Sequence, residues 1–347
     1  MKRRVLTPTI PTRPIYLLGL LLLLLLTSCT GGVKPEPEQE VHPVWPAAPE
    51  KAHLEWVGEY RVLKETAARK GFFGHLANFF LGPKIAYLER PYGVCTDGGQ
   101  QLFIADAGGG KIHVFDMVTG DYSAITGDKN TALQSPINIR YIAGSLYLTD
   151  SVQGVVLRYL PEEDRLVLWS QVELERPTGL AFDKVAERFY VSDSARHEIV
   201  ILDRNGGELF RFGSWGAGPG QFNFPTDLWV DNDGQLYVTD ALNARVQVFD
   251  TEGNYLREFG RRGDTQGRFS KPKGVAVDSH GHVFVVDALF DAVQIFDTEG
   301  RLLMAFGDNG VGAGQFWLPS GIFIDGRNYV YVSDTYNRRI QVFKELE

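Results

Sequence analysis

The chain has 347 residues, of which 44% are hydrophobic and 12% aromatic, so it can bury a large core and is not a disordered polymer. Lys and Arg total 35 against 43 Asp and Glu, and the net charge of −8 excludes nucleic acid as an expected partner, because its phosphate backbone is also negative. Only two cysteines, Cys29 and Cys95, are present, which excludes a disulfide scaffold and a zinc site built from thiolates.

Residues 1–28 have the pattern of a secretion signal. Basic residues precede an apolar run over residues 15–26, which is shorter than the ~20 residues of a transmembrane helix. The run ends in Leu-Thr-Ser-Cys29, which resembles the bacterial lipobox, whose cysteine thiol carries diacylglycerol. We therefore predict a lipid on Cys29 that anchors the chain in the cell envelope, and Thr30 after it favours the outer membrane of a Gram-negative cell. An ordinary signal peptide followed by a chance cysteine is the alternative.

Residues 29–53 are rich in proline and glutamate. This composition favours an extended, solvated segment that rises about 3.1 Å per residue where it adopts polyproline geometry. We predict that residues 29–53 form a lipidated tether, which holds a folded domain of residues 54–347 away from the membrane surface.

Six prolines mark an internal repeat, and each is followed by a short apolar strand that begins a four-strand unit. Their spacings are 45, 41, 48, 47 and 47 residues, and the prolines are Pro91, Pro136, Pro177, Pro225, Pro272 and Pro319. Strands of five to seven residues rich in Val, Phe and Tyr, separated by turns that contain glycine, exclude a helical repeat. Six units of four antiparallel strands predict an all-β, six-bladed β-propeller, rather than a solenoid or a sandwich.

The two ends of the repeat array are expected to meet. The sixth unit has three strands up to Glu347, whereas residues 54–63, before the first unit, alternate like an outer strand. We predict that this N-terminal strand completes the sixth blade and so removes an exposed sheet edge.

One insertion interrupts the pattern between the closing strand and Pro91. Residues 66–82 are predicted to form a short helix that ends at Gly82-Pro83. Its apolar residues share one helical face: Phe72, Leu76, Phe79 and Phe80. The helix either packs on the propeller or contacts a partner or a membrane.

Two of the units follow a known repeat pattern. Residues 272–278 read Pro-x-Gly-Val-Ala-Val-Asp, and residues 330–343 read Val-Tyr-Val-x-Asp-x-x-Asn-x-Arg-Ile-Gln-Val-Phe, which resembles the NHL repeat. The resemblance covers about residues 54–344 and implies a six-bladed propeller of a bacterial lipoprotein type. It does not imply one activity, because NHL-like propellers include lyases, protein scaffolds and RNA binders.

One aspartate in each unit ends the second strand: Asp106, Asp150, Asp193, Asp240, Asp287 and Asp334. A ring of carboxylates could hold a cation, but an aspartate at a strand end can also accept backbone N–H bonds from its own loop, and we predict this structural role. No cofactor is expected. Structural calcium stays open, because residues 240–243 and 334–337 contain oxygen ligands.

Ligand specificity is expected from positions that face the same way and yet differ between units. They are the residue after each repeat proline, the third residue after each strand-ending aspartate, and polar neighbours of both. The predicted ligand-binding residues are Tyr92, Arg140, Thr178, His197, Asp227, Asn243, Lys273, Asp291, Ser320 and Asn337. This mixture of aromatic, cationic and acidic side chains suits a polar ligand or a peptide.

The histidines argue against a metal-dependent enzyme at this surface. Amidating lyases of the NHL-like group hold a metal with several histidines, whereas here only His197 and His75 can approach the expected ligand face. His280 and His282 flank a hairpin turn on the opposite face, so no metal site is predicted. We predict a membrane-anchored, extracytoplasmic scaffold that binds a protein or an exported ligand without catalysis. A lyase or hydrolase acting at the mouth of the central channel is the alternative.

Overall fold

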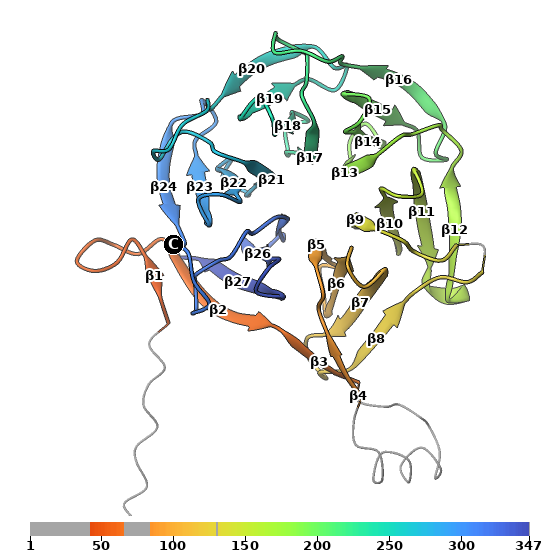
Figure 1. Cartoon of the computed structure of the whole chain (residues 1–347), viewed down its shortest axis with the longest axis horizontal. Helices are drawn as coiled ribbons and strands as arrows, with labels where there is room; N and C mark the ends of the chain where they lie inside the picture. Colours follow the sequence, from red (N-terminus) through yellow and green to blue (C-terminus); the bar gives the residue numbers. More distant parts are fainter. Residues whose placement is uncertain (1–41, 66–83, 130, 347) are drawn as a thin grey trace, which may run out of the picture. The chain divides into compact units, whose positions relative to one another are not determined.

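The computed structural model describes residues 42–65, 84–129 and 131–346. These residues form six antiparallel blades arranged in a ring (Figure 1), five with four strands and the sixth with five, which confirms the predicted all-β, six-bladed propeller. The predicted signal peptide over residues 1–28, the predicted lipidation site Cys29 and the predicted helical insertion over residues 66–82 lie outside the described residues.

Blades 1 to 3 follow one another in the chain, each with its strands in sequence order. Blade 1 contains β5 (Pro91–Thr96), β6 (Gln101–Asp106), β7 (Lys111–Asp116) and β8 (Tyr122–Ile125). Blade 2 contains β9 (Pro136–Ile142), β10 (Ser145–Asp150), β11 (Val155–Leu160), the 3₁₀ turn η1 (Pro161–Glu163) and β12 (Arg165–Ser170). Blade 3 contains β13 (Pro177–Asp183), β14 (Arg188–Asp193), β15 (Glu198–Leu202) and β16 (Glu208–Phe212).

Blades 4 and 5 repeat this order, and blade 6 combines both ends of the described chain. Blade 4 contains β17 (Pro225–Val230), β18 (Leu236–Asp240), β19 (Arg245–Phe249) and β20 (Tyr255–Phe259). Blade 5 contains β21 (Pro272–Val277), β22 (Val283–Asp287), β23 (Ala292–Phe296) and β24 (Leu302–Phe306). Blade 6 contains β25 (Ile322–Ile324), β26 (Tyr329–Asp334), β27 (Arg339–Glu345), β2 (Leu54–Tyr60) and β1 (Val44–Trp45).

The middle strands of a blade are apolar on both faces because each blade is packed between two others. In β22, Phe284 and Val286 pack into the core shared with blade 6. Val283 and Val285 pack into the core shared with blade 4. Successive side chains of a strand point to opposite faces, so a continuous apolar run is what this architecture requires.

The N-terminal strand closes the ring, as the sequence predicts. Strand β2 pairs antiparallel with β27, and Leu54 lies opposite Glu345. The Glu59 carboxylate accepts a hydrogen bond from Arg339 Nη1 at 2.6 Å, and Trp56 Nε1 donates to Gln341 Oε1 at 3.0 Å. These contacts join the two chain ends of the described part through both backbone and side chains.

The predicted tether ends earlier than residue 53, because residues 42–53 belong to the propeller. Strand β1 (Val44–Trp45) pairs with β2 as a fifth strand of blade 6. The Trp45 ring lies 5.7 Å, between centroids, from both Phe306 and Phe343. The proline content suggested a solvated segment, but the apolar area of a tryptophan favours packing against these rings.

Two further strands, β3 (Val62–Glu65) and β4 (Lys84–Tyr87), form an antiparallel pair that leads from β2 into blade 1. Within the described part of the chain, no helix has the length and apolar character needed to cross a membrane.

Candidate functional site

The strand-ending aspartates fix the loops at one end of the ring. Asp106 accepts N–H bonds from Glu89 and Arg90, which precede blade 1, and from Gly108 and Gly109, which follow β6. Each of the other five aspartates accepts at least one N–H from the segment before its blade: Asp150 from Gln134, Asp193 from Glu175, Asp240 from Asn223, Asp287 from Ser270 and Asp334 from Trp317. The predicted structural role is confirmed, with donors from two loops rather than one.

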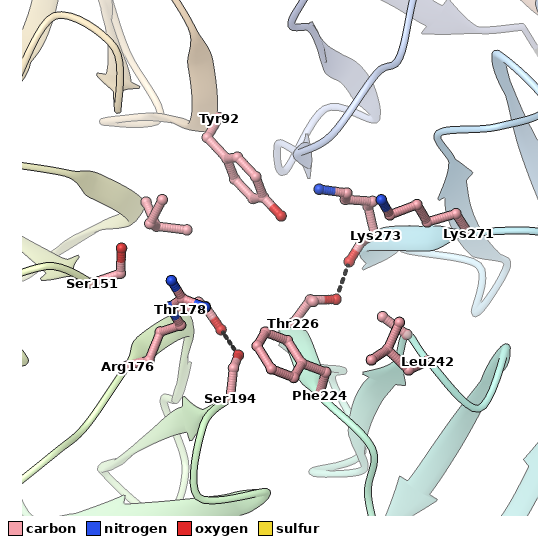
Figure 2. Close-up of a pocket in the computed structure, with 12 residues that line it drawn as sticks. Tyr92, Ser151, Arg176, Thr178, Ser194, Phe224, Thr226, Leu242, Lys271 and Lys273 are labelled. Carbon is pink, nitrogen blue, oxygen red and sulfur yellow. Dashed lines mark hydrogen bonds between the residues drawn. The ribbon is translucent and has the colours of Figure 1, made fainter.

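A pocket of about 390 Å³ opens at this end of the ring (Figure 2). The innermost strands or adjoining loops of blades 1 to 5 contribute to its walls. The lining residues are Tyr92, Ile137, Ser151, Arg176, Thr178, Ser194, Phe224, Thr226, Ala241, Leu242, Lys271 and Lys273. This volume lies at the lower end of the range for small-molecule sites, which is about 300–1,000 Å³.

The pocket carries positive charge in a chain of net charge −8. Lys273 Nζ lies 5.3 Å from the centroid of the Tyr92 ring, and Arg176 Cζ lies 5.8 Å from that of Phe224. Burial leaves the Lys273 ammonium group incompletely solvated and so lowers its pKa. Among the described lining residues there is no carboxylate. An anionic group in the pocket would therefore meet cations whose charge nothing in the lining offsets.

Asp227 lies buried next to the pocket and is held by three donors. Asn138 Nδ2 donates to it at 2.6 Å, and the backbone N–H groups of Leu228 and Val275 donate at 2.9 and 3.2 Å. Burial raises the pKa of Asp227 to about 6. Burial, together with the Asp227 charge, raises the pKa of Tyr92 well above its usual range. The Tyr92 phenol consequently remains protonated and can donate a hydrogen bond to a ligand.

Farther along the innermost strands, side chains from three blades pack against one another. Arg140 Cζ lies 5.4 Å from the centroid of the Trp229 ring and 6.0 Å from that of Phe323. The guanidinium Nη1 donates to Asn138 Oδ1 at 2.8 Å and to the Ile139 carbonyl at 2.9 Å.

Asn138 and Asp227 occupy a position that is glycine in the other four blades. A Cβ at Gly93 would lie 2.6 Å from the Ile137 carbonyl oxygen, and one at Gly274 would lie 2.6 Å from that of Ser320. Neighbouring innermost strands therefore approach too closely for a side chain in these blades. Blades 2 and 4 depart from this rule, and their two side chains bond to each other.

The predicted ligand-binding residues fall into three groups. Tyr92, Thr178 and Lys273 line the pocket. Asp227 and Arg140 are 2% and 9% exposed and lie in the buried network just described. Ser320 is also buried, and its hydroxyl hydrogen-bonds Thr335 and does not line the pocket.

The four remaining predicted residues hold loops together and do not line the pocket. His197 Nδ1 accepts the Phe224 N–H at 3.1 Å, and Asp291 accepts the Leu318 N–H at 2.6 Å. Asn243 and Asn337 donate to nearby carbonyl oxygens, those of Gly216 and Gly310 respectively, and to the strand-ending aspartates. These positions vary because different blades hold their loops with different side chains.

Several residues that line the pocket were not predicted from the sequence, among them Arg176, Phe224, Leu242 and Lys271. Three of them directly precede a repeat proline. The residues at this position also differ between blades, so comparing both neighbours of each proline would have found them.

Comparison with known proteins supports the fold. A family model described as "6-bladed beta-propeller" matches residues 171–258. Similar solved structures include a structural genomics protein of unknown function from Bacteroides thetaiotaomicron, with 15% identity, a TM-score of 0.60 and coverage of 75% of this chain and 70% of that chain. An auxiliary nutrient binding protein from the same organism matches with 13% identity, the same TM-score of 0.60 and the same coverage of 75% and 70%.

Virginiamycin B lyase from Staphylococcus aureus is also similar, with 13% identity, a TM-score of 0.56 and coverage of 74% of this chain and 96% of that chain. At such identities the likeness extends to the fold and not to the function. The ring, the family model and these neighbours together identify the chain as a six-bladed β-propeller.

Proposed function

We propose that this protein is a lipid-anchored, extracytoplasmic NHL-type propeller that binds a small anionic ligand with an apolar part. The observation that carries the proposal is the cationic pocket formed by Arg176, Lys271 and Lys273 beside the rings of Tyr92 and Phe224. A carboxylate or phosphate would pair with the cations, and the apolar part would contact the rings. The terminal carboxylate of a peptide has the same chemistry.

Binding can be measured by calorimetry with the full-length protein in detergent. We expect N-acetylphenylalanine and phenyl phosphate to bind saturably, whereas the neutral N-acetylphenylalaninamide binds at least tenfold more weakly. The two anions separate a carboxylate site from a phosphate site. Equal affinity for the acid and its amide would contradict the proposal.

A matched pair of variants ties the binding to the pocket. Lys273→Met should weaken binding of the preferred anion at least tenfold, because it removes a partly desolvated cation. Lys184→Met is the control, since Lys184 is exposed in the β13–β14 hairpin and bonds to Asn232. Equal losses of affinity in both variants would indicate nonspecific charge attraction and contradict the assignment of binding to the pocket.

A lyase acting in the same pocket is the second candidate. The observation in its favour is Lys273, whose lowered pKa would suit a proton-accepting amine. Recovery of a bound ligand in a chemically changed form would replace the binding proposal with this one.

Anchoring through Cys29 rests on the lipobox-like residues that precede it. The wild-type protein should partition into the detergent phase, and Cys29→Ala should move it to the aqueous phase. A wild-type protein found in the aqueous phase would contradict lipidation.

A further inference from the structure

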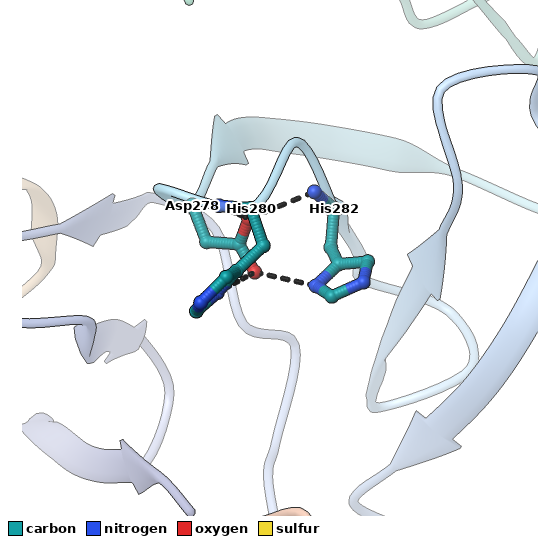
Figure 3. A group of neighbouring side chains, drawn as sticks. All are labelled: Asp278, His280 and His282. Carbon is teal, nitrogen blue, oxygen red and sulfur yellow. Dashed lines mark hydrogen bonds and ion pairs between the residues drawn. The ribbon is translucent and has the colours of Figure 1, made fainter. Parts of the chain in front are cut away.

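Blade 5 carries a cluster of imidazole and carboxylate groups at the end opposite the pocket (Figure 3). Asp278, His280 and His282 lie in the hairpin that connects β21 to β22. Each of the three offers one ligand atom, and these atoms all lie within 4.8 Å of one another. The spacing in the hairpin thus brings two imidazoles to one carboxylate.

The two oxygens of Asp278 have different roles. Oδ1 accepts the backbone N–H groups of both His280 and His282, each at 2.8 Å, and so fixes the hairpin. Oδ2 lies 2.7 Å from His282 Nδ1 and 3.9 Å from His280 Nδ1. The Asp278 side chain is fully buried, so one oxygen is held in place beside both imidazoles.

The equivalent hairpin of blade 4 shows which residues of this turn the fold requires. Asp231 accepts the N–H groups of Asp233 and Gln235 at 2.9 and 2.8 Å, which is the same turn geometry. The aspartate therefore belongs to the repeat. The imidazoles do not, because blade 4 forms the same turn without them.

A fourth group comes from the next blade. Glu345 ends β27, and its Oε2 lies 3.8 Å from His280 Nδ1. This oxygen is buried and receives no hydrogen bond from an N–H donor of the described residues, and the Glu345 carboxyl group faces that of Asp278. A buried carboxylate oxygen without a donor is costly unless a cation or a proton satisfies it. Its position beside the histidines points to a ligand shared by both blades.

We propose that Asp278, His280, His282 and Glu345 bind one divalent transition-metal ion, of which zinc is the best match. Two imidazoles and two carboxylates are typical zinc ligands, whereas Ca²⁺ and Mg²⁺ prefer oxygen ligands throughout. Zinc bonds of about 2.0–2.2 Å place tetrahedral ligand atoms about 3.3 Å apart. The His280 and His282 side chains are 63% and 43% exposed, so they can rotate to close the remaining gap around the fixed Asp278.

The ion would connect blade 5 to β27 of blade 6, the strand that pairs with the closing strand β2. Glu345 lies opposite Leu54 in the pairing of β27 with β2. A metal bound to the folded ring, and not to the separated strands, stabilises the folded state by mass action. We therefore expect zinc to raise the melting temperature as well as to bind.

The test is titration of the chelator-treated, full-length protein in detergent with zinc chloride, followed by calorimetry and thermal melting. We expect one equivalent to bind and the melting temperature to rise, with no comparable effect of Ca²⁺ or Mg²⁺. His280→Ala and Glu345→Gln should each weaken zinc binding at least tenfold. Asp278 is left unchanged because it holds the hairpin.

His42→Ala is the matched control, because His42 lies 3.6 Å from Glu55 as a simple histidine–carboxylate pair. Zinc affinity should be unchanged in this variant. Absence of saturable zinc binding, or equal affinity in the wild type and His280→Ala, would overturn the site. Loss of binding in His280→Ala but not in Glu345→Gln would overturn the link between the blades.

Discussion

Arg245 in blade 4 and Arg339 in blade 6 make nearly the same set of contacts, whereas the cations of the pocket occupy positions at which the residue type differs between blades. Each of the two arginines donates through Nε to its strand-ending aspartate, at 2.8 and 2.6 Å. Each also donates to three carbonyl oxygens of the loop before its blade, and to a glutamate on the outer strand, Glu258 or Glu59.

The pocket cations lie in a different setting. Arg176 and Lys271 are exposed, and Lys273 is only partly buried. Arg245 and Arg339 are thus fully used in holding loops, while the pocket cations keep donors available. A residue that repeats between blades therefore explains the scaffold, and a ligand must be recognised by the residues that break the repeat.

The largest effect is expected from removing the closing strand, which holds the repeated framework together. Deletion of residues 54–60 leaves the outer edge of β27 unpaired and removes Glu59 from Arg339. We expect loss of the cooperative thermal transition and aggregation, measured by circular dichroism and light scattering. Truncation at residue 41, which keeps β1 and β2, is the control. A deletion variant that melts like this control would contradict ring closure.

The next effect concerns the buried arginines. Arg339 is 1% exposed, and Arg339→Ala leaves the buried Asp334 carboxylate without its cation, so it should lower the free energy of unfolding by about 3–5 kcal/mol. Arg245→Ala should cost a similar amount, and urea denaturation measures both. Arg327→Ala, at a side chain that is 61% exposed, should change stability by less than about 1 kcal/mol. A similar loss in all three variants would end the distinction between framework and surface arginines.

The fold could be predicted because its signals repeat. Six prolines at near-equal spacing, strands of similar length and one missing outer strand all agree, and closure by β2 follows from that count. The residues of the pocket were harder to predict. Tyr92 and Lys273 were found because the residue after the repeat proline lines the pocket in five of the six blades.

Whether a residue before a proline or in a loop faces the pocket depends on local backbone geometry, which the sequence pattern does not specify. The strand register shifts between Pro177 and Leu180, at a bulge that sets how the chain enters the blade beside Arg176. His197 has a φ of 60°, and its side chain accepts a backbone N–H rather than facing the pocket. Such left-handed positions are not encoded by residue type alone unless glycine occupies them.

A third, intermediate effect should appear as a pH dependence. The pKa of Asp227 is about 6 in the folded protein against 3.8 in the reference state, so the folded state binds this proton more tightly. The corresponding stability, on the order of 3 kcal/mol, is fully present below pH 4 and is lost as the pH rises through about 6. In Asp227→Asn this contribution disappears. Urea denaturation at several pH values checks the difference, and parallel curves for both proteins would contradict it.

Asp291 should show a smaller effect on stability and none on binding. Its carboxylate accepts the Leu318 N–H and the Asn309 amide, so Asp291→Ala should cost about 1–2 kcal/mol. The affinity for N-acetylphenylalanine should be unchanged, because Asp291 does not line the pocket. Weaker ligand binding in this variant would return Asp291 to the binding surface that the sequence analysis predicted.

The smallest effect on stability is expected at Lys271, a pocket residue whose side chain is not part of the repeated framework. Its backbone N–H donates to Asp287, and this bond survives any change of the side chain. The side chain is exposed, so Lys271→Gln should alter the free energy of unfolding by less than about 0.5 kcal/mol. It nevertheless removes one of three cations from the pocket, and the affinity for an anionic ligand should fall about fivefold, which corresponds to ~1 kcal/mol. Lys271→Gln should therefore weaken binding and leave stability unchanged, whereas Arg339→Ala should lower stability. If Lys271→Gln left anion binding unchanged, Lys271 would belong to the solvated surface and recognition would rest on Arg176 and Lys273.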